Sequence, residues 1–139
     1  MNILLVEDDD VAAESVVRSP RRHAMEFPVT IAHDGLEALA ILRGEAPIKI
    51  GKPYIILLDL NMPRMNGFEF LREIRTDAKL RDSIIFVLTT SNADSDRTLA
   101  YKENIAGYLV KSAVGPQFTH LAKLLDSYSN AVTLPGTHR

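Results

Sequence analysis

Polar side chains follow four short apolar segments of this 139-residue chain. They are an acidic pair, a single aspartate, a threonine and a lysine, namely Glu7, Asp8, Asp59, Thr89 and Lys111. Carboxylates that gather in one place repel each other and cannot all stay ionised without compensation. Magnesium prefers oxygen ligands and keeps several waters, so two carboxylates, a carbonyl group and water suit it. If the fold brings these residues together, they predict a magnesium site.

The same residues are suited to bind a phosphoryl group. The cation would neutralise one phosphoryl oxygen, and the Lys111 ammonium group would pair with another as a point charge. The Thr89 hydroxyl could donate a hydrogen bond to a third oxygen. Asp59 would then be the group with a free oxygen facing phosphorus, which makes it the candidate nucleophile.

Five short, continuously apolar segments are expected to be strands buried on both faces. They cover residues 3–6, 29–32, 54–58, 84–88 and 107–110. Helices are expected between them and after the last one. The first would run from residue 11 to about 19, where Pro20 interrupts it, and the second over 36–43, capped by Asp34. The third would follow the cap Asn66, with Phe70, Leu71 and Ile74 on its inner face. The fourth would run from Asp94 or Asp96 to about 104, and the fifth from 116 onward, with Pro116 in its first turn.

Alternating strands and helices with right-handed crossovers predict a doubly wound parallel sheet. We expect a flavodoxin-like α/β fold of five parallel strands in the order 2-1-3-4-5 with five helices. In such sheets, sites lie outside the carboxyl ends of the strands. This order places Asp59 between the acids of the first strand and Thr89. Residues 44–53, which contain two Gly and two Pro, are expected to form a loop.

Composition limits the classes of protein that remain. The chain has the length of one domain, which we assign to residues 1–132, followed by a frayed tail over 133–139 and no output domain. A net charge of −2 gives no basic field for nucleic acid. The lack of Cys excludes disulfides and thiolate metal sites. Neither a signal peptide nor an apolar run of the ~20 residues that span a membrane is present, so we expect a cytoplasmic protein.

Four motifs connect these predictions to a known family. They are ILLVEDD at residues 3–9, LLDLNMPRMNG at 57–67, VLTTS at 87–91 and YLVK at 108–111. In their order and spacing, they resemble the receiver domains of two-component response regulators. Each motif is weak alone, but together they are specific and cover nearly the whole chain.

The resemblance implies a role for each acidic residue. Asp59 would accept the phosphoryl group, and Asp8 and Asp59 would bind magnesium directly. The backbone carbonyl of Asn61 would complete the protein ligands, and Glu7 would hold a metal-bound water.

The resemblance also implies how the chain would respond to phosphorylation. Thr89 and Tyr108 would form a coupled switch, in which Thr89 moves toward the phosphoryl group and Tyr108 follows. Lys111 would bind a phosphoryl oxygen. The side chains of Asn61 and Ser91 would tune hydrolysis of the acyl phosphate by shaping the access of water.

One departure from the family pattern follows the lysine. The family usually has a proline there, joined by a cis peptide bond, whereas this chain has Ser112. A non-proline cis bond costs ~3 kcal/mol, so the isomer of the Lys111–Ser112 bond and the reach of Lys111 stay open.

The long 44–53 loop and the TTS sequence resemble small stand-alone regulators that partner phytochrome-type histidine kinases. A sensor histidine kinase is therefore the expected partner, and output is expected through protein contacts. The face formed by the fourth helix, fifth strand and fifth helix would serve partner binding or homodimerisation. Its candidate residues are Arg97, Thr98, Tyr101, Lys102, Phe118 and Leu121, although core packing would explain Phe118 and Leu121 equally well.

Two other classes of function remain in competition. A magnesium-dependent phosphohydrolase of the dehalogenase type needs a second acid two residues after its nucleophile, where this chain has Asn61. The second class is a binding module that has lost phosphorylation; the complete set of acids, Thr89 and Lys111 argues against it, whereas Ser112 in place of the usual proline keeps it open. We expect a phosphoacceptor that catalyses only its own phosphorylation and dephosphorylation, not an enzyme with an external substrate.

Overall fold

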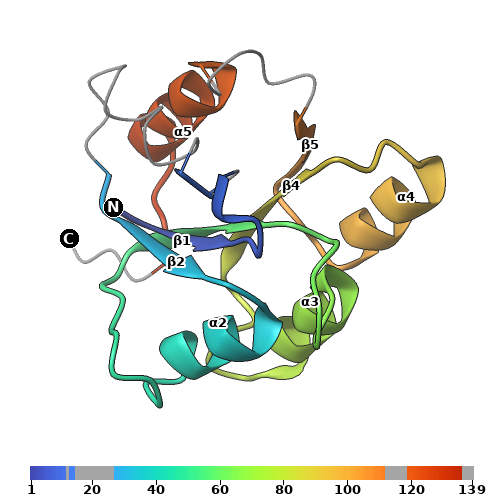
Figure 1. Cartoon of the computed structure of the whole chain (residues 1–139). Helices are drawn as coiled ribbons and strands as arrows, with labels where there is room; N and C mark the ends of the chain where they lie inside the picture. Colours follow the sequence, from blue (N-terminus) through green and yellow to red (C-terminus); the bar gives the residue numbers. More distant parts are fainter. Residues whose placement is uncertain (12, 15–26, 112–118, 136–139) are drawn as a thin grey trace.

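The computed structural model describes residues 1–11, 13–14, 27–111 and 119–135 (Figure 1). The first helical turn includes residues 10, 11, 13 and 14; the rest of the first expected helix, with Pro20, lies outside the described residues. The elements with defined bounds are β1 (Asn2–Val6), β2 (Val29–Ala32), α2 (Gly35–Leu42), β3 (Tyr54–Leu58), α3 (Gly67–Thr76), β4 (Ile84–Thr89), α4 (Asp94–Lys102), β5 (Gly107–Val110) and α5 (Thr119–Ala131).

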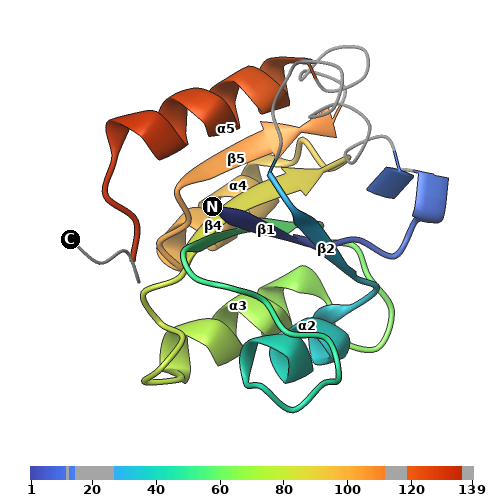
Figure 2. The ribbon, with the colours of Figure 1, turned by 90° about the vertical axis from the view of Figure 1, so that its left-hand side faces the viewer.

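The strands form one parallel sheet in the order β2-β1-β3-β4-β5, which confirms the predicted topology. Figure 2 shows α2 and α3 on one side of the sheet and α5 on the other. The central strand β3 pairs with β1 and β4, so that Leu58 lies beside Val6 and Val87. The carboxyl ends of these strands therefore meet at one edge of the sheet.

Alternate residues of the strands fill two separate cores, because successive strand side chains point to opposite faces. On one face, Leu4, Ile56 and Ile85 pack with residues of α2, α3 and α4, among them Phe70 and Ala100. On the other face, Ile3, Leu5, Ile55, Leu57, Phe86 and Leu88 pack with Leu121 and Leu125 of α5. Burial on both faces explains why these strands carry no polar alternation.

The predicted helix starts are confirmed where a cap was identified. Asp34 caps α2 by accepting a hydrogen bond from the backbone N–H of Glu37. Asn66 caps α3 in a capping box with Glu69. The helix α4 begins at Asp94 but ends at Lys102, slightly before the expected end, and Asn104 then adopts a left-handed φ of 57°.

The prediction of a frayed tail was wrong for its described part. Leu134 is only 6% exposed and belongs to the core beneath α5. Burial of this large apolar side chain removes apolar surface from water, which favours contact between this part of the chain and the core. Within the described residues, none of the helices is long and apolar enough to cross a membrane.

Candidate functional site

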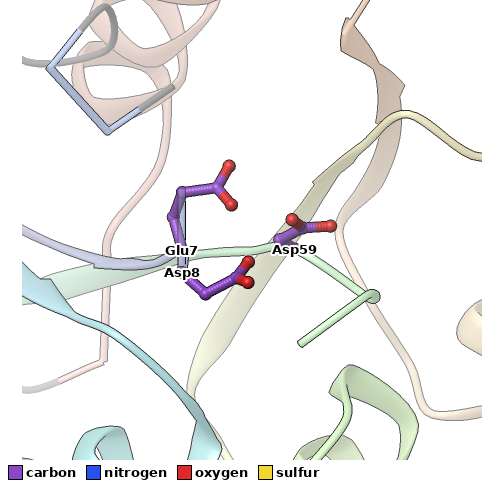
Figure 3. A group of neighbouring side chains, drawn as sticks. All are labelled: Glu7, Asp8 and Asp59. Atoms are coloured by element: carbon purple, nitrogen blue, oxygen red, sulfur yellow. The ribbon is translucent and has the colours of Figure 1, made fainter. Parts of the chain in front are cut away.

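Three carboxyl groups meet at the carboxyl edge of the sheet. Glu7 and Asp8 directly follow β1, and Asp59 directly follows the neighbouring strand β3. Figure 3 shows Glu7 and Asp8 extending from the end of β1 toward Asp59. One oxygen from each residue lies within 4.8 Å of the others. Glu7 is 2% and Asp59 7% exposed, whereas Asp8 faces solvent.

Lys111 reaches this cluster from the end of β5. Its ammonium group pairs with the Glu7 carboxylate and lies 3.6 Å from Oδ2 of Asp59. Burial lowers the pKa of Lys111, but hydrogen bonding to Glu7 and the charges of Asp59 and Glu7 outweigh it, so the net pKa is raised. Lys111 therefore stays a cation at neutral pH. The contact with Glu7 was not predicted from the motifs, which indicated the strand ends but not which side chains pair across them.

The electrostatics of the cluster fit a hard divalent cation. The pKa of Glu7 is raised to about 7, mainly by burial and also by the hydrogen bond and charge of Asp59, against the opposing effect of Lys111. One ammonium group thus compensates the three carboxyl groups only in part. A divalent cation with oxygen ligands would supply positive charge here, and the carboxylates of Asp8 and Asp59 could hold it.

The loop after β3 borders the same site. The backbone N–H of Asn61 donates to Oδ1 of Asp59 over 3.2 Å, which keeps the Asn61 backbone close to the acids. Asn61 and Asp8 also line an open cleft of about 440 Å³ together with Asp96 of α4. The sequence motifs did not identify Asp96, which could have been read only as an acid in the first turn of a helix.

Thr89, Ser91 and Tyr108 form a connected network beside the acids. Thr89 ends β4 fully buried, and its Oγ1 accepts from the Ser91 backbone N–H over 3.4 Å. The Tyr108 hydroxyl donates to the Ser91 carbonyl over 2.9 Å. The Ser91 hydroxyl donates to Oδ2 of Asp96 over 2.5 Å. Ser91 therefore links the end of β4, the side chain on β5 and the first turn of α4.

The residues predicted for a partner surface divide into two groups. Tyr101 is 47% exposed on α4, where Thr98 and Lys102 are also exposed and Arg97 is partly exposed. Leu121 is buried in the core, so for this residue the core-packing alternative holds. Ser112 and Phe118 lie outside the described residues, as does the start of the last helix expected at Pro116.

A close backbone approach fixes the end of the loop after Asp59. A Cβ atom on Gly67 would lie 2.6 Å from Cα of Leu60 and 2.9 Å from the carbonyl oxygen of Asp59. Although alanine is the better helix former, we expect Gly67→Ala to lower the free energy of unfolding by about 2 kcal/mol, because the backbone must move. Chemical denaturation measures this loss. Arg72→Ala, on the exposed face of the same helix, should change it by less than about 0.5 kcal/mol; equal effects would contradict the steric explanation.

Comparison with known proteins places these features in a family context. The profile of the response regulator receiver domain matches residues 3–123. Response regulator Rcp1 of Synechocystis sp. is 33% identical over 135 residues, which span 96% of this chain and 92% of Rcp1.

Two solved structures agree closely with the fold. The phosphorylated cyanobacterial phytochrome response regulator RcpA superposes with a TM-score of 0.85 at 32% identity, covering 97% of this chain and 98% of RcpA. The Mn²⁺-bound form of Rcp1 superposes with a TM-score of 0.81 at 31% identity, covering 96% of this chain and 98% of that one.

Proposed function

The chain belongs to the response regulator receiver domain family, and from this premise we propose that it is a signalling switch phosphorylated on Asp59 by a histidine kinase. The observation that carries the proposal is the cluster of Glu7, Asp8 and Asp59 with Lys111 at 3.6 Å from Asp59. A buried carboxylate beside a cation and two further acids is suited to nucleophilic attack on a phosphoryl group.

In the proposed transfer, a carboxylate oxygen of Asp59 forms a bond to phosphorus while the bond from phosphorus to the donor histidine nitrogen breaks. The nitrogen keeps the electron pair of that bond. Lys111 stabilises one phosphoryl oxygen, for which it must turn from Glu7 toward Asp59, and Thr89 donates to another. A magnesium ion, when bound by Asp8, Asp59 and the Asn61 carbonyl, supplies positive charge for the remaining oxygen.

Hydrolysis of the acyl phosphate would return the protein to its resting state. Asn61 lines the open cleft, and the Ser91 hydroxyl is held by Asp96 beside it. We infer that these two side chains set the access of water to the phosphoryl group. The protein would thus catalyse only its own phosphorylation and dephosphorylation, since Asn61 occupies the place where a phosphohydrolase of the dehalogenase type carries its second acid.

The proposed partner is a sensor histidine kinase of the phytochrome type. Support comes from RcpA, described as a cyanobacterial phytochrome response regulator, which is similar to this chain over almost its whole length. The exposed side chains of α4, such as Tyr101, make the face of α4, β5 and α5 the proposed surface for output or homodimerisation. Nucleic acid is not a proposed ligand, because the net charge is −2.

Phosphotransfer tests the proposed function directly. A sensor histidine kinase of the phytochrome type is first autophosphorylated and then mixed with the chain in the presence of magnesium. The expected result is that the kinase loses its phosphoryl group and that the mass of this chain increases by one phosphoryl group. If neither this kinase nor a small acyl phosphate donor transferred a phosphoryl group to the chain, the result would contradict the proposal.

The coupled switch gives a separate prediction for Tyr108. Its hydroxyl is held by the Ser91 carbonyl, and the Ser91 N–H is held by Thr89. If Thr89 moves toward a phosphoryl group, the Tyr108 environment should change. We expect beryllium fluoride with magnesium, a mimic of the phosphoryl group, to shift the ring resonances of Tyr108 in an NMR spectrum. The Asp59→Asn variant should show no shift, and an unchanged Tyr108 in the wild-type protein would exclude the coupling.

A further inference from the structure

An ion pair outside the acidic site ties the loop between β3 and α3 to the start of α2. Nε of Arg64 donates to Oδ2 of Asp34 over 2.8 Å, and a terminal guanidinium nitrogen contacts the same oxygen. The other oxygen of Asp34 accepts from the Glu37 backbone N–H over 2.9 Å. One carboxylate therefore caps a helix with one oxygen and holds the loop with the other.

The burial of Asp34 distinguishes this pair from an ordinary surface salt bridge. The Asp34 side chain is 4% exposed and that of Arg64 62% exposed. Burial raises the pKa of Asp34. The hydrogen bonds from Glu37 and Arg64 and the charge of Arg64 lower it by more, so the net pKa lies below the usual value. Removing a partner of a buried ionised carboxylate is costly because it leaves a buried charge uncompensated. Ion pairs that are fully exposed contribute little to stability.

The backbone of Arg64 is itself unusual. Its φ is +64°, in the left-handed region that non-glycine residues seldom adopt. Such a conformation is unfavourable for a residue with a side chain and persists where the surroundings hold it. The next residue, Met65, packs so closely on α2 that a Cβ atom on Gly35 would lie 2.9 Å from its Cγ. Two consecutive loop residues thus contact two consecutive residues at the start of α2.

The loop held by these contacts leads directly from Asp59. At its beginning, the Asn61 N–H donates to the Asp59 side chain. At its end, the Gly67 N–H donates to the Leu60 carbonyl over 2.9 Å. Between these points, Arg64 makes the only described side-chain ion pair of the loop residues 60–66. Its contact with Asp34 therefore bears on the path of the backbone at Asn61.

We propose that Arg64 is a positioning residue for the metal site: its ion pair with Asp34 holds the loop in the conformation in which the Asn61 backbone lies beside Asp8 and Asp59. The inference rests on the proposed function, because it assumes that a divalent cation binds there. Arg64 itself would touch neither the cation nor the phosphoryl group. Its loss should weaken metal binding through the loop, as substitutions of residues behind the ligands do in other metal sites.

The test is the affinity for Mg²⁺ and Mn²⁺, measured by titration calorimetry on the unphosphorylated protein. Arg64→Ala should bind both ions about tenfold more weakly than the wild-type protein. The matched control is Arg43→Ala. Arg43 also joins α2 to the region of α3, through Asp77 at 3.2 Å and Glu73 at 3.4 Å, but it lies far along α2 from the site. Its loss should leave metal affinity unchanged, and an equal weakening in both variants would overturn the inference.

Two further variants separate the ion pair from the backbone conformation. Arg64→Gly favours the left-handed backbone but removes the guanidinium group, so it should bind metal as weakly as Arg64→Ala. Asp34→Asn keeps a helix-capping acceptor but removes the charge, and combining it with Arg64→Ala should weaken binding no more than Arg64→Ala alone. Wild-type affinity in Arg64→Ala or Arg64→Gly, or additive losses in the double variant, would overturn the positioning role. If the wild-type protein bound neither ion, the proposed function would fail first, and this inference with it.

Discussion

Asp59→Asn is expected to abolish formation of the acyl phosphate while leaving the fold intact. The amide has nearly the same shape as the carboxylate but has no anionic oxygen to attack phosphorus. The backbone contact that places residue 59, its N–H to the Val6 carbonyl at 3.0 Å, does not depend on the side chain. The variant also has one fewer carboxylate in the cluster with Glu7 and Asp8, so less repulsion opposes folding.

The measurement is the intact mass of wild-type and variant proteins after incubation with the phosphorylated kinase and magnesium. The wild-type protein should gain a phosphoryl group and Asp59→Asn should not, with thermal unfolding at the same temperature or higher. Asp82→Asn is the matched control, because Asp82 is an exposed acid just before β4, at the opposite edge of the sheet. It should be phosphorylated like the wild-type protein. Transfer onto Asp59→Asn would reject Asp59 as the acceptor.

Most of the fold could be predicted because each strand carries a strong local signal. Residues 54–58 are five apolar residues in a row between a Gly/Pro-rich loop and an aspartate, and they form the central strand with nearly complete burial. The caps Asp34 and Asn66 could also be predicted from the sequence, since short polar side chains at helix starts satisfy unpaired backbone N–H groups. Leu134 was missed because one apolar residue in a polar tail has no periodicity.

The same topology predicts where the site lies, but it does not predict which side chains contact each other within the site. The last residues of parallel strands lie at one edge of the sheet, which is why the sequence alone groups Asp8, Asp59, Thr89 and Lys111. Which acid Lys111 contacts depends on its rotamer and on the burial of Glu7, and neither is encoded in a motif. The contact of Arg64 could not be predicted for a similar reason: its partner Asp34 is 30 residues away, and loop arginines are usually solvated.

Removal of divalent cations is expected to abolish phosphorylation as completely as Asp59→Asn does. Two unit charges of the same sign 4 Å apart repel by about 4 kcal/mol at the effective dielectric constant near a protein surface. The three carboxyl groups lie within 4.8 Å of one another, and among the described residues only Lys111 provides them with a paired cation. An incoming phosphoryl group would add further negative charge that this one ammonium group cannot balance.

Phosphorylation should therefore stop in excess chelator and return when Mg²⁺ or Mn²⁺ is added, whereas sodium chloride of equal ionic strength should not restore it. Circular dichroism in chelator should be unchanged, because the sheet and its two cores contain no metal ligand. Asp8→Asn should need a higher magnesium concentration for half-maximal phosphorylation, since it would remove a proposed carboxylate ligand and leave the proposed nucleophile Asp59 in place. Undiminished transfer in chelator would mean that Lys111 and Thr89 suffice to stabilise the phosphoryl group, and the magnesium assignment would then be wrong although Asp59 could still be the acceptor.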